Sequence, residues 1–201
     1  CSVGIIDDDF QHQNKTYDFN KLLQKISLLE LPVTVFKSKT NGAHIVIYFD
    51  SYYPAVDVRH ILKKLAYQLC EGKFDLFPRQ DAVPGDSYGS FINLPYHNQN
   101  TRVLLNSEGN ELNFDDAMLY ASKRVVKLDD LEVFKILADK EMTDSRNCRL
   151  FRAKQYFKTQ YPKEFENKVR QLNNLYQEPI TEQELNATVL KQNAPDYFDK
   201  E

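Results

Sequence analysis

A chain of 201 residues, of which 42% are hydrophobic, is long enough to bury a core and allows one or two domains. The formal net charge of -3 excludes a uniformly basic nucleic-acid coat, so any contact with DNA must come from a local basic patch. Cys1, Cys70 and Cys148 have no Cys-x-x-Cys spacing, which excludes a disulfide framework and a structural zinc knuckle. No apolar run reaches the roughly 18 residues of a membrane span, and no signal peptide is recognisable. We therefore expect a cytoplasmic protein without a membrane partner.

The first part of the chain alternates between the patterns of strands and helices. Runs of β-branched and aromatic residues predict strands, and apolar residues spaced three or four apart predict helices. In chain order, the predicted elements are a strand at 2–6, a helix at 17–29, strands at 33–36 and 44–49, a helix at 54–70, and strands at 75–77 and 90–94. This alternation predicts an α+β fold, a mixed or antiparallel sheet with helices on one face.

After a predicted short hairpin at 102–105 and 111–114, the character of the chain changes. Charged segments with apolar residues at helical spacing follow, and Thr181 with Glu184 forms a capping box that indicates a helix start. The predicted helices cover 115–122, 129–137, 149–160, 162–176 and 181–192. We expect a boundary near 125–128, with a catalytic core at 1–126 and an all-α helical bundle at 127–201.

The most informative motif is the triplet Asp7-Asp8-Asp9, which follows an apolar strand. Side chains two residues apart on a strand point to the same face, so Asp7 and Asp9 can share divalent cations while Asp8 points the other way. Farther along, the segment Ser-Lys-Thr-Asn-Gly-Ala-His at 38–44 predicts a turn that can cradle phosphates. Together the two motifs indicate a metal-dependent nucleotidyl-transfer site.

Two further segments complete a recognisable order. Phe-Asp-Leu-Phe-Pro-Arg-Gln stands at 74–80, and Gly-Ser-Phe-Ile-Asn-Leu-Pro-Tyr stands at 89–96. With the segments 5–10 and 38–44, they resemble the motifs of the archaeo-eukaryotic primase superfamily, and above all the primase-polymerases of phages and mobile elements. The resemblance covers roughly the first 125 residues, and it depends on four short motifs in order rather than on any one of them.

The resemblance implies a core like an RNA-recognition motif and the activity of a DNA primase-polymerase for replication. Two cations, Mg²⁺ or Mn²⁺, would stabilise the attacking and leaving oxygens during attack on a nucleoside triphosphate. The implied metal ligands and catalytic residues are Asp7, Asp9 and Asp75. The implied nucleotide-binding residues are Ser38, Lys39, Thr40, Gly42, His44, Arg79 and Gln80.

The resemblance also implies partners and neighbouring domains. Relatives act on single-stranded DNA, can be joined to a helicase domain or protein, and often follow the core with a helical bundle that helps to hold the template. They usually carry an α/β unit before the first acidic motif. Because this chain begins at Cys1 rather than Met, we expect a fragment that lacks that unit.

Each assignment has an alternative. The acidic triplet can be a solvated loop, His44 can be a structural histidine, and Asp75 can cap a strand or pair with Lys73. Other nearby carboxylates that could complete the metal site are Asp50, Asp81 and Asp86. A basic template-binding face is predicted from Arg149, Arg152 and Lys154, with a solvated helix face as the alternative.

Two other functions remain open from the sequence. The first is a non-catalytic replication-initiation or nucleic-acid-binding module that keeps the fold. The second is a metallonuclease, which would use the same carboxylates without the triphosphate turn.

Overall fold

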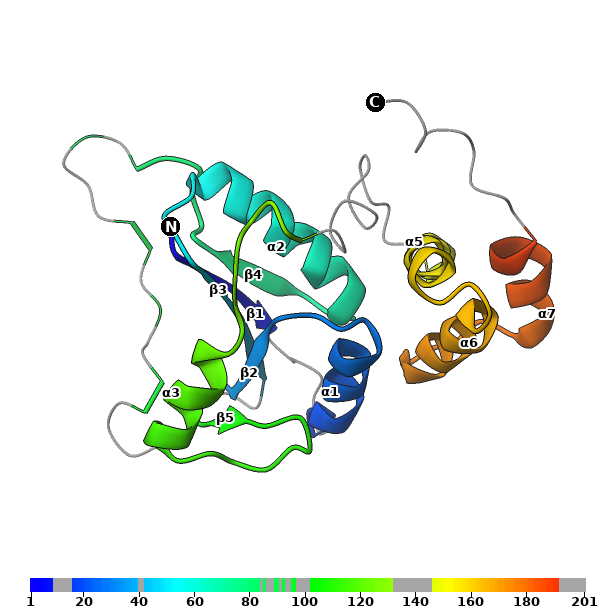
Figure 1. Cartoon of the computed structure of the whole chain (residues 1–201), viewed down its shortest axis with the longest axis horizontal. Helices are drawn as coiled ribbons and strands as arrows, with labels where there is room; N and C mark the ends of the chain where they lie inside the picture. Colours follow the sequence, from blue (N-terminus) through cyan, green and yellow to red (C-terminus); the bar gives the residue numbers. More distant parts are fainter. Residues whose placement is uncertain are drawn as a thin grey trace. The chain divides into compact units, whose positions relative to one another are not determined.

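In the computed structural model the chain forms two compact units, Cys1–Glu132 and Val133–Glu201 (Figure 1). The described residues are 1–8, 16–39, 42–83, 85, 89–90, 92, 95–96, 102–131 and 146–191. Among these residues, no helix is long and apolar enough to cross a membrane.

The first unit is built on one sheet. Its elements are β1 (Val3–Asp8), α1 (Phe19–Leu28), β2 (Thr34–Lys37), β3 (Ala43–Phe49), α2 (Ala55–Leu69), β4 (Phe74–Phe77), β5 (Leu104–Leu105), α3 (Phe114–Ser122) and β6 (Val125–Val126). The strand order is β4-β1-β3-β2-β5, and every neighbouring pair along it is antiparallel. In addition, β6 pairs in parallel with the end of β3. The predicted α+β fold is confirmed.

The helix α2 packs on one face of this sheet, with α1 beside it (Figure 1). Strand β1 presents Gly4, Ile6 and Asp8 to this face, because alternate residues of a strand share a face. At Gly4 the approach is close: a Cβ there would lie 3.0 Å from side-chain atoms of Leu62 and Val58 in α2. The core between sheet and helix therefore leaves no room for a side chain at this position.

The opposite face of the sheet is partly covered by α3. Ala117 of this helix packs with Phe36, Val46 and Leu104, and several half-buried side chains complete the cluster. Those side chains are Ile5, Tyr48, Tyr96, Leu112 and Tyr120. The sheet is thus covered by helices on both faces, whereas the sequence pattern predicted helices on one face only.

Several local predictions differ from the structure. In the segment predicted as a strand at 90–94, the described residues Ser90 and Ile92 lie in no strand. The predicted second hairpin reduces to a single bridge between Leu105 and Glu111, because Asn113 caps α3 and the helix begins at Phe114. Of the helix predicted at 129–137, the described part, 129–131, is not helical.

A buried polar cluster lies under the helices at the end of β1. The Tyr17 hydroxyl donates a hydrogen bond of 2.7 Å to Asp8 Oδ2, and both residues are buried. Burial raises the pKa of Asp8, while hydrogen bonds from Tyr17 and Cys70 and the charge of Lys25 act in the opposite direction. Lys25 in turn bonds to the carbonyl of Leu69 at 3.3 Å. The cluster thus supplies partners for a carboxylate that would otherwise be costly to bury.

The second unit is helical in its described part. It contains α5 (Arg146–Gln160), α6 (Phe165–Leu175) and α7 (Glu182–Leu185), which continues into the π-helical turn η1 (Asn186–Leu190). Thr181 caps α7 by accepting a hydrogen bond from the backbone nitrogen of Glu184. The buried side chains that join these helices are Leu150, Ala153, Phe157, Val169, Leu172, Leu185 and Val189.

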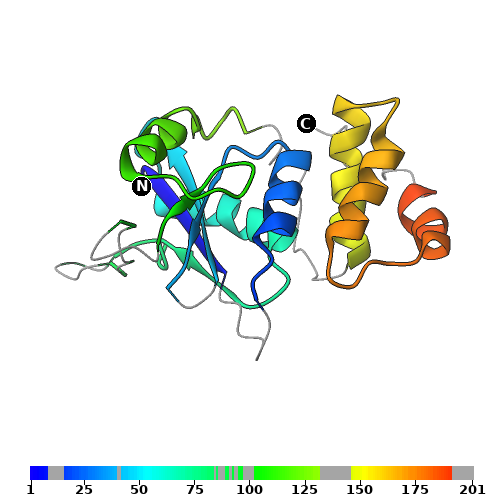
Figure 2. The same ribbon diagram turned by 90° about the horizontal axis from the view of Figure 1, so that it is seen from below.

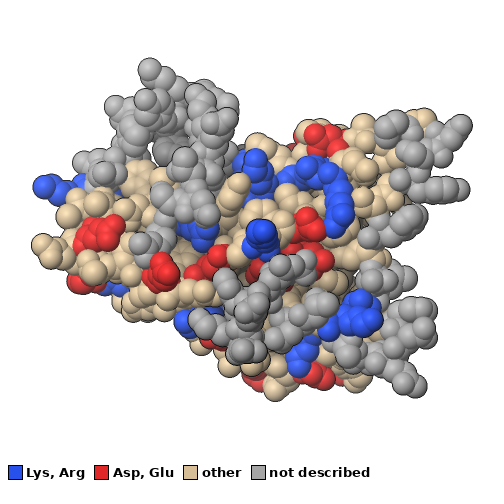
Figure 3. Space-filling model, turned by 180° about the vertical axis from the view of Figure 1, so that it is seen from behind, with Lys and Arg blue, Asp and Glu red and all other residues tan. Residues whose placement is uncertain are grey.

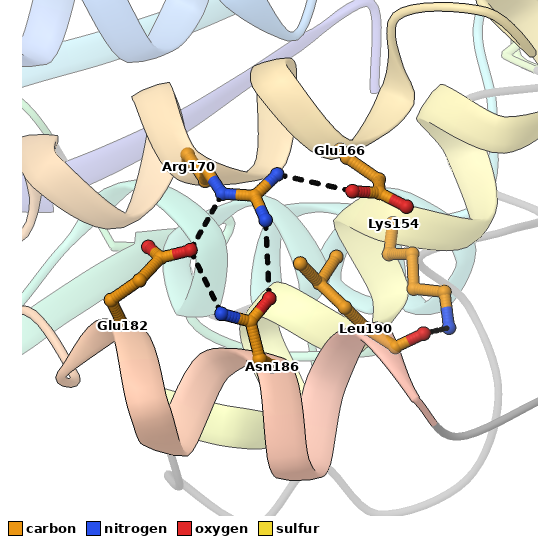
Figure 4. A network of polar contacts seen from close by, with 6 residues as sticks. All are labelled: Lys154, Glu166, Arg170, Glu182, Asn186 and Leu190. Carbon is orange, nitrogen blue, oxygen red and sulfur yellow. Dashed lines mark hydrogen bonds and ion pairs between the residues drawn. The ribbon is translucent and has the colours of Figure 1, made fainter.

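Polar contacts connect the same helices (Figure 4). Arg170 on α6 donates to Glu182 at 2.8 Å, to Glu166 at 3.2 Å and to Asn186 at 3.1 Å. On the other side of η1, Lys154 of α5 donates to the backbone carbonyls of Val189 and Leu190. The π-helical turn η1 is therefore bonded to both α5 and α6.

Replacing Tyr17 with Phe should lower the free energy of unfolding by about 1–3 kcal/mol, because it removes the hydroxyl donor from a buried carboxylate. Urea unfolding at pH 7 measures the change. Tyr52→Phe is the matched control, since the Tyr52 side chain is almost fully exposed. Equal stability of Tyr17→Phe and the wild type would contradict this role.

Candidate active site

The candidate site is a row of side chains that crosses the sheet at one end of β1. In the antiparallel register, Asp7 stands opposite Asp75 of β4 on one side and opposite His44 of β3 on the other. The row continues from His44 to Phe36 of β2. Directly opposite residues of an antiparallel pair point to the same face. This face is the one opposite α2, because Asp7 alternates with Ile6 and Asp8.

Asp7 is the centre of the row. Its side chain is 20% exposed, and His44 Nε2 lies 3.2 Å from Asp7 Oδ1. Apart from this contact, Asp7 Oδ1 is a buried oxygen for which the described residues supply no hydrogen bond. Such an oxygen is the kind of atom that a bound cation would satisfy.

Asp75 is more exposed, at 52% for its side chain, and its Oδ2 accepts from Arg79 Nη2 at 2.6 Å. The Arg79 guanidinium also lies 4.9 Å from the centre of the Phe77 ring. Like charges directly opposite each other on neighbouring strands are destabilising, so the two carboxylates of Asp7 and Asp75 need positive charge nearby. Arg79 supplies part of this positive charge at the Asp75 carboxylate.

The predicted phosphate-binding turn joins β2 and β3 beside the end of β1. The backbone nitrogen of Ser38 donates to the carbonyl of Gly42 at 2.9 Å, which closes the turn. Lys39 is exposed and Gly42 is buried. Thr40 and Asn41 lie outside the described residues. Ala43, the first residue of β3, pairs with Asp8, the last residue of β1. The turn therefore lies at the end of β1 that carries Asp7.

The loop that follows β4 carries the other two predicted nucleotide-binding residues, Arg79 and Gln80, and both are exposed. It is held by Arg59 of α2, which the sequence motifs did not single out. Arg59 Nη1 donates to the carbonyls of Pro78 and Arg79, and its Nε lies 2.6 Å from Asp81 Oδ1. No sequence signal marks Arg59, because the contact depends on how α2 packs against β4.

Asp9, the second predicted carboxylate of the first motif, lies outside the described residues. Within the described part of the chain, no three His, Cys, Asp or Glu side chains gather closely enough to hold a metal ion by themselves. Of the alternative carboxylates, Asp50 follows β3 and Asp81 follows β4, so neither stands in the row. Asp81 pairs with Arg59, and Asp50 accepts from the Tyr53 hydroxyl at 3.0 Å. Asp86 lies outside the described residues.

The three predicted template-binding residues, Arg149, Arg152 and Lys154, lie on α5 and differ in burial. Lys154 is 2% exposed and its ammonium group donates to two backbone carbonyls of η1, so this charge is not available to a phosphate chain. Burial, with the charge of Lys158, lowers the pKa of Lys154. Arg149 is also buried, and its guanidinium lies 6.0 Å from the centre of the Tyr176 ring. Arg152 is half-buried.

One face of the space-filling view shows how the charged side chains of the described residues are distributed. On the face shown in Figure 3, Lys and Arg side chains are interspersed with Asp and Glu side chains.

Replacing Lys154 with Met should lower the free energy of unfolding by about 1 kcal/mol, since two helix-end carbonyls lose their donor. Affinity for single-stranded DNA should stay the same, as measured by fluorescence anisotropy beside the exposed control Lys158→Met. A several-fold loss of DNA affinity in Lys154→Met alone, with the fold intact, would support the template-binding role.

Comparison with known proteins agrees with the geometry. A family model described as the archaeo-eukaryotic primase domain of TOTE conflict systems matches residues 1–127, which contain the carboxylate row, the turn and the loop after β4. A search of the curated proteins found no match. The predicted membership of the archaeo-eukaryotic primase superfamily is confirmed, and that superfamily is generally one of nucleotidyltransferases. The chain therefore belongs to the family of archaeo-eukaryotic primase domains of TOTE conflict systems.

Proposed function

We propose that this protein is a primase-polymerase, which transfers nucleotides from nucleoside triphosphates to a growing strand on a single-stranded DNA template. One observation carries the proposal: Asp7 and Asp75 stand opposite each other on neighbouring strands, with His44 on the other side of Asp7. A carboxylate pair beside an imidazole, on the sheet face away from α2, suits a triphosphate bound together with cations.

The residues fit a divalent cation, Mg²⁺ or Mn²⁺. Asp7 Oδ1 is buried and has no hydrogen-bond donor in the described part of the chain, and a second carboxylate, Asp75, stands directly opposite. Asp7 and Asp75 would hold the metal, with Asp9 as the third ligand predicted from the motif. When bound, the cations supply charge stabilisation for the attacking and leaving oxygens of the transfer.

The remaining residues act on the triphosphate. His44 presents its Nε2 beside Asp7, where an imidazole can donate to a phosphate oxygen. Lys39 and the backbone of the turn closed by Ser38 and Gly42 add positive charge and amide donors. Arg79 places its guanidinium beside Asp75. Gln80 would donate a hydrogen bond to the sugar or base, or accept one from it, through its amide. These side chains bind and orient the nucleotide.

We extend the proposal to the second unit, to a helicase partner and to the cellular compartment. The unit Val133–Glu201 would assist template or initiating-nucleotide binding, and a helicase domain or protein would supply single strands. All three cysteines carry thiols, which suits a reducing compartment such as the cytoplasm.

Two variants test the metal site. Asp7→Asn and Asp75→Asn should each lower nucleotide incorporation by more than about 100-fold. Removing a residue that only hydrogen-bonds to a metal ligand costs about 10- to 100-fold, so a direct ligand should cost more. Incorporation is measured on single-stranded DNA with labelled deoxynucleoside and ribonucleoside triphosphates, with Mg²⁺ or Mn²⁺, with and without a primer.

Asp50→Asn is the matched control, because Asp50 is an exposed carboxylate outside the row. Activity retained by Asp7→Asn would refute the assignment. A wild type that binds single-stranded DNA but neither triphosphate nor metal would support the alternative, a non-catalytic replication-initiation module.

His44→Ala should raise the KM for the nucleotide about tenfold, the value of one hydrogen bond to a phosphate, and leave affinity for single-stranded DNA unchanged. Steady-state incorporation and fluorescence anisotropy measure the two effects. If DNA affinity fell while KM stayed constant, His44 would contact the template instead.

A further inference from the structure

Arg59 connects α2 to the loop after β4 through three contacts of one guanidinium. Its Nη1 donates to the carbonyl of Pro78 at 2.8 Å and also to the carbonyl of Arg79, and its Nε lies 2.6 Å from Asp81 Oδ1. The side chain is 30% exposed, so the contacts are partly shielded from solvent. A guanidinium can make such a set of contacts because its donors are held in a rigid plane.

These contacts lie at a bend in the loop. Carbonyls of consecutive residues point to opposite sides of an extended chain, but those of Pro78 and Arg79 accept from the same nitrogen. The backbone is therefore bent at this point, and Arg59 holds the bend. With its carbonyl turned toward Arg59, Arg79 sends its guanidinium to Asp75 Oδ2 at 2.6 Å.

The same arrangement links α2 to the candidate site. Asp75 belongs to the carboxylate row, and Arg79 and Gln80 are the predicted nucleotide-binding residues of the loop. Arg59 itself makes no described contact with Asp7 or His44. Its influence on the row passes through the loop backbone.

We propose that Arg59 is a positioning residue that holds Pro78–Asp81 so that Arg79 and Gln80 face the incoming nucleoside triphosphate. This inference depends on the proposed function, because it assigns a role within the same site. It differs from a merely structural clamp, which would add stability to the packing of α2 on β4 without affecting nucleotide affinity.

The test compares Arg59→Ala and Arg59→Lys with the control Lys63→Ala, an exposed cation on the same helix. Arg59→Ala should raise the KM for the nucleotide about tenfold and change kcat less than about twofold, because the loop residues bind rather than react. Arg59→Lys should restore little, since an ammonium group cannot reproduce the planar fork. Asp81→Asn should cause a smaller increase, because the two carbonyl contacts remain.

Two measurements separate positioning from stability. Hydrogen exchange should speed up at residues 79–83 in Arg59→Ala and not in Lys63→Ala, while Mn²⁺ affinity stays at the wild-type value. Equilibrium binding of a fluorescent deoxyadenosine triphosphate in the presence of Ca²⁺ should weaken by the same factor as KM rises.

Wild-type nucleotide affinity in Arg59→Ala, with or without faster loop exchange, would overturn the inference and leave the proposed function intact. If the wild type neither binds nor incorporates the triphosphate, the proposed function fails, and the assignment of Arg59 fails with it. The two failures are distinguished by the behaviour of the wild type alone.

Discussion

The antiparallel register of β1 between β3 and β4 is the constraint on which the candidate site depends. This register places Asp75, Asp7 and His44 in one row, and the alternation of the strand sends Asp8 to the opposite face, where Tyr17 binds it. A shift of the register by one residue would exchange the two faces, burying Asp7 under the helices and exposing Asp8. The core contacts of Gly4 and Ile6 oppose such a shift, because both residues belong to the face that α2 covers. Hydrophobic packing on the α2 face of β1 therefore secures the polar geometry on the opposite face.

Elements with strong periodic patterns were predicted well from the sequence. The helices α1 and α2, the hairpin of β2 and β3, and the opposed directions of Asp7 and Asp8 follow from spacing alone. The strand β6 was missed because two residues, Val125 and Val126, are too short for any pattern, and their pairing with β3 is a tertiary contact. The coverage of the second sheet face by α3 was missed for a related reason: its buried Ala117 and Ala121 form a narrow apolar stripe that does not reveal its partner. Arg59 could not be found, since its partners are backbone carbonyls of a distant loop.

Charge on the second unit shows where sequence reasoning is weakest. A run of basic residues on a helix has the same appearance whether it faces solvent, a phosphate chain or a neighbouring helix. Figure 2 shows the helices α5, α6 and α7 of this unit beside one another. Here Lys154 satisfies the last carbonyls of η1, and Arg170 joins Glu166 of α6, Glu182 of α7 and Asn186 of η1 (Figure 4). The π-helical turn η1 is short and buries few side chains. It is stabilised by these polar contacts and by the burial of Leu185 and Val189. The basic side chains thus act as internal connections between helices.

The parallel pairing of β6 with β3 has a mechanical consequence. The backbone nitrogen of Asp50 donates to the carbonyl of Val126, and the backbone nitrogen of Leu128 donates to the Tyr53 hydroxyl oxygen, so the chain leaving the sheet is attached at the Phe49 end of β3. That end lies five residues from His44, roughly 17 Å along the strand. A pull on the chain beyond this point would load the β3–β6 pair before any force reached the carboxylate row. The geometry of the candidate site is in this way separated from tension on the chain beyond Leu128.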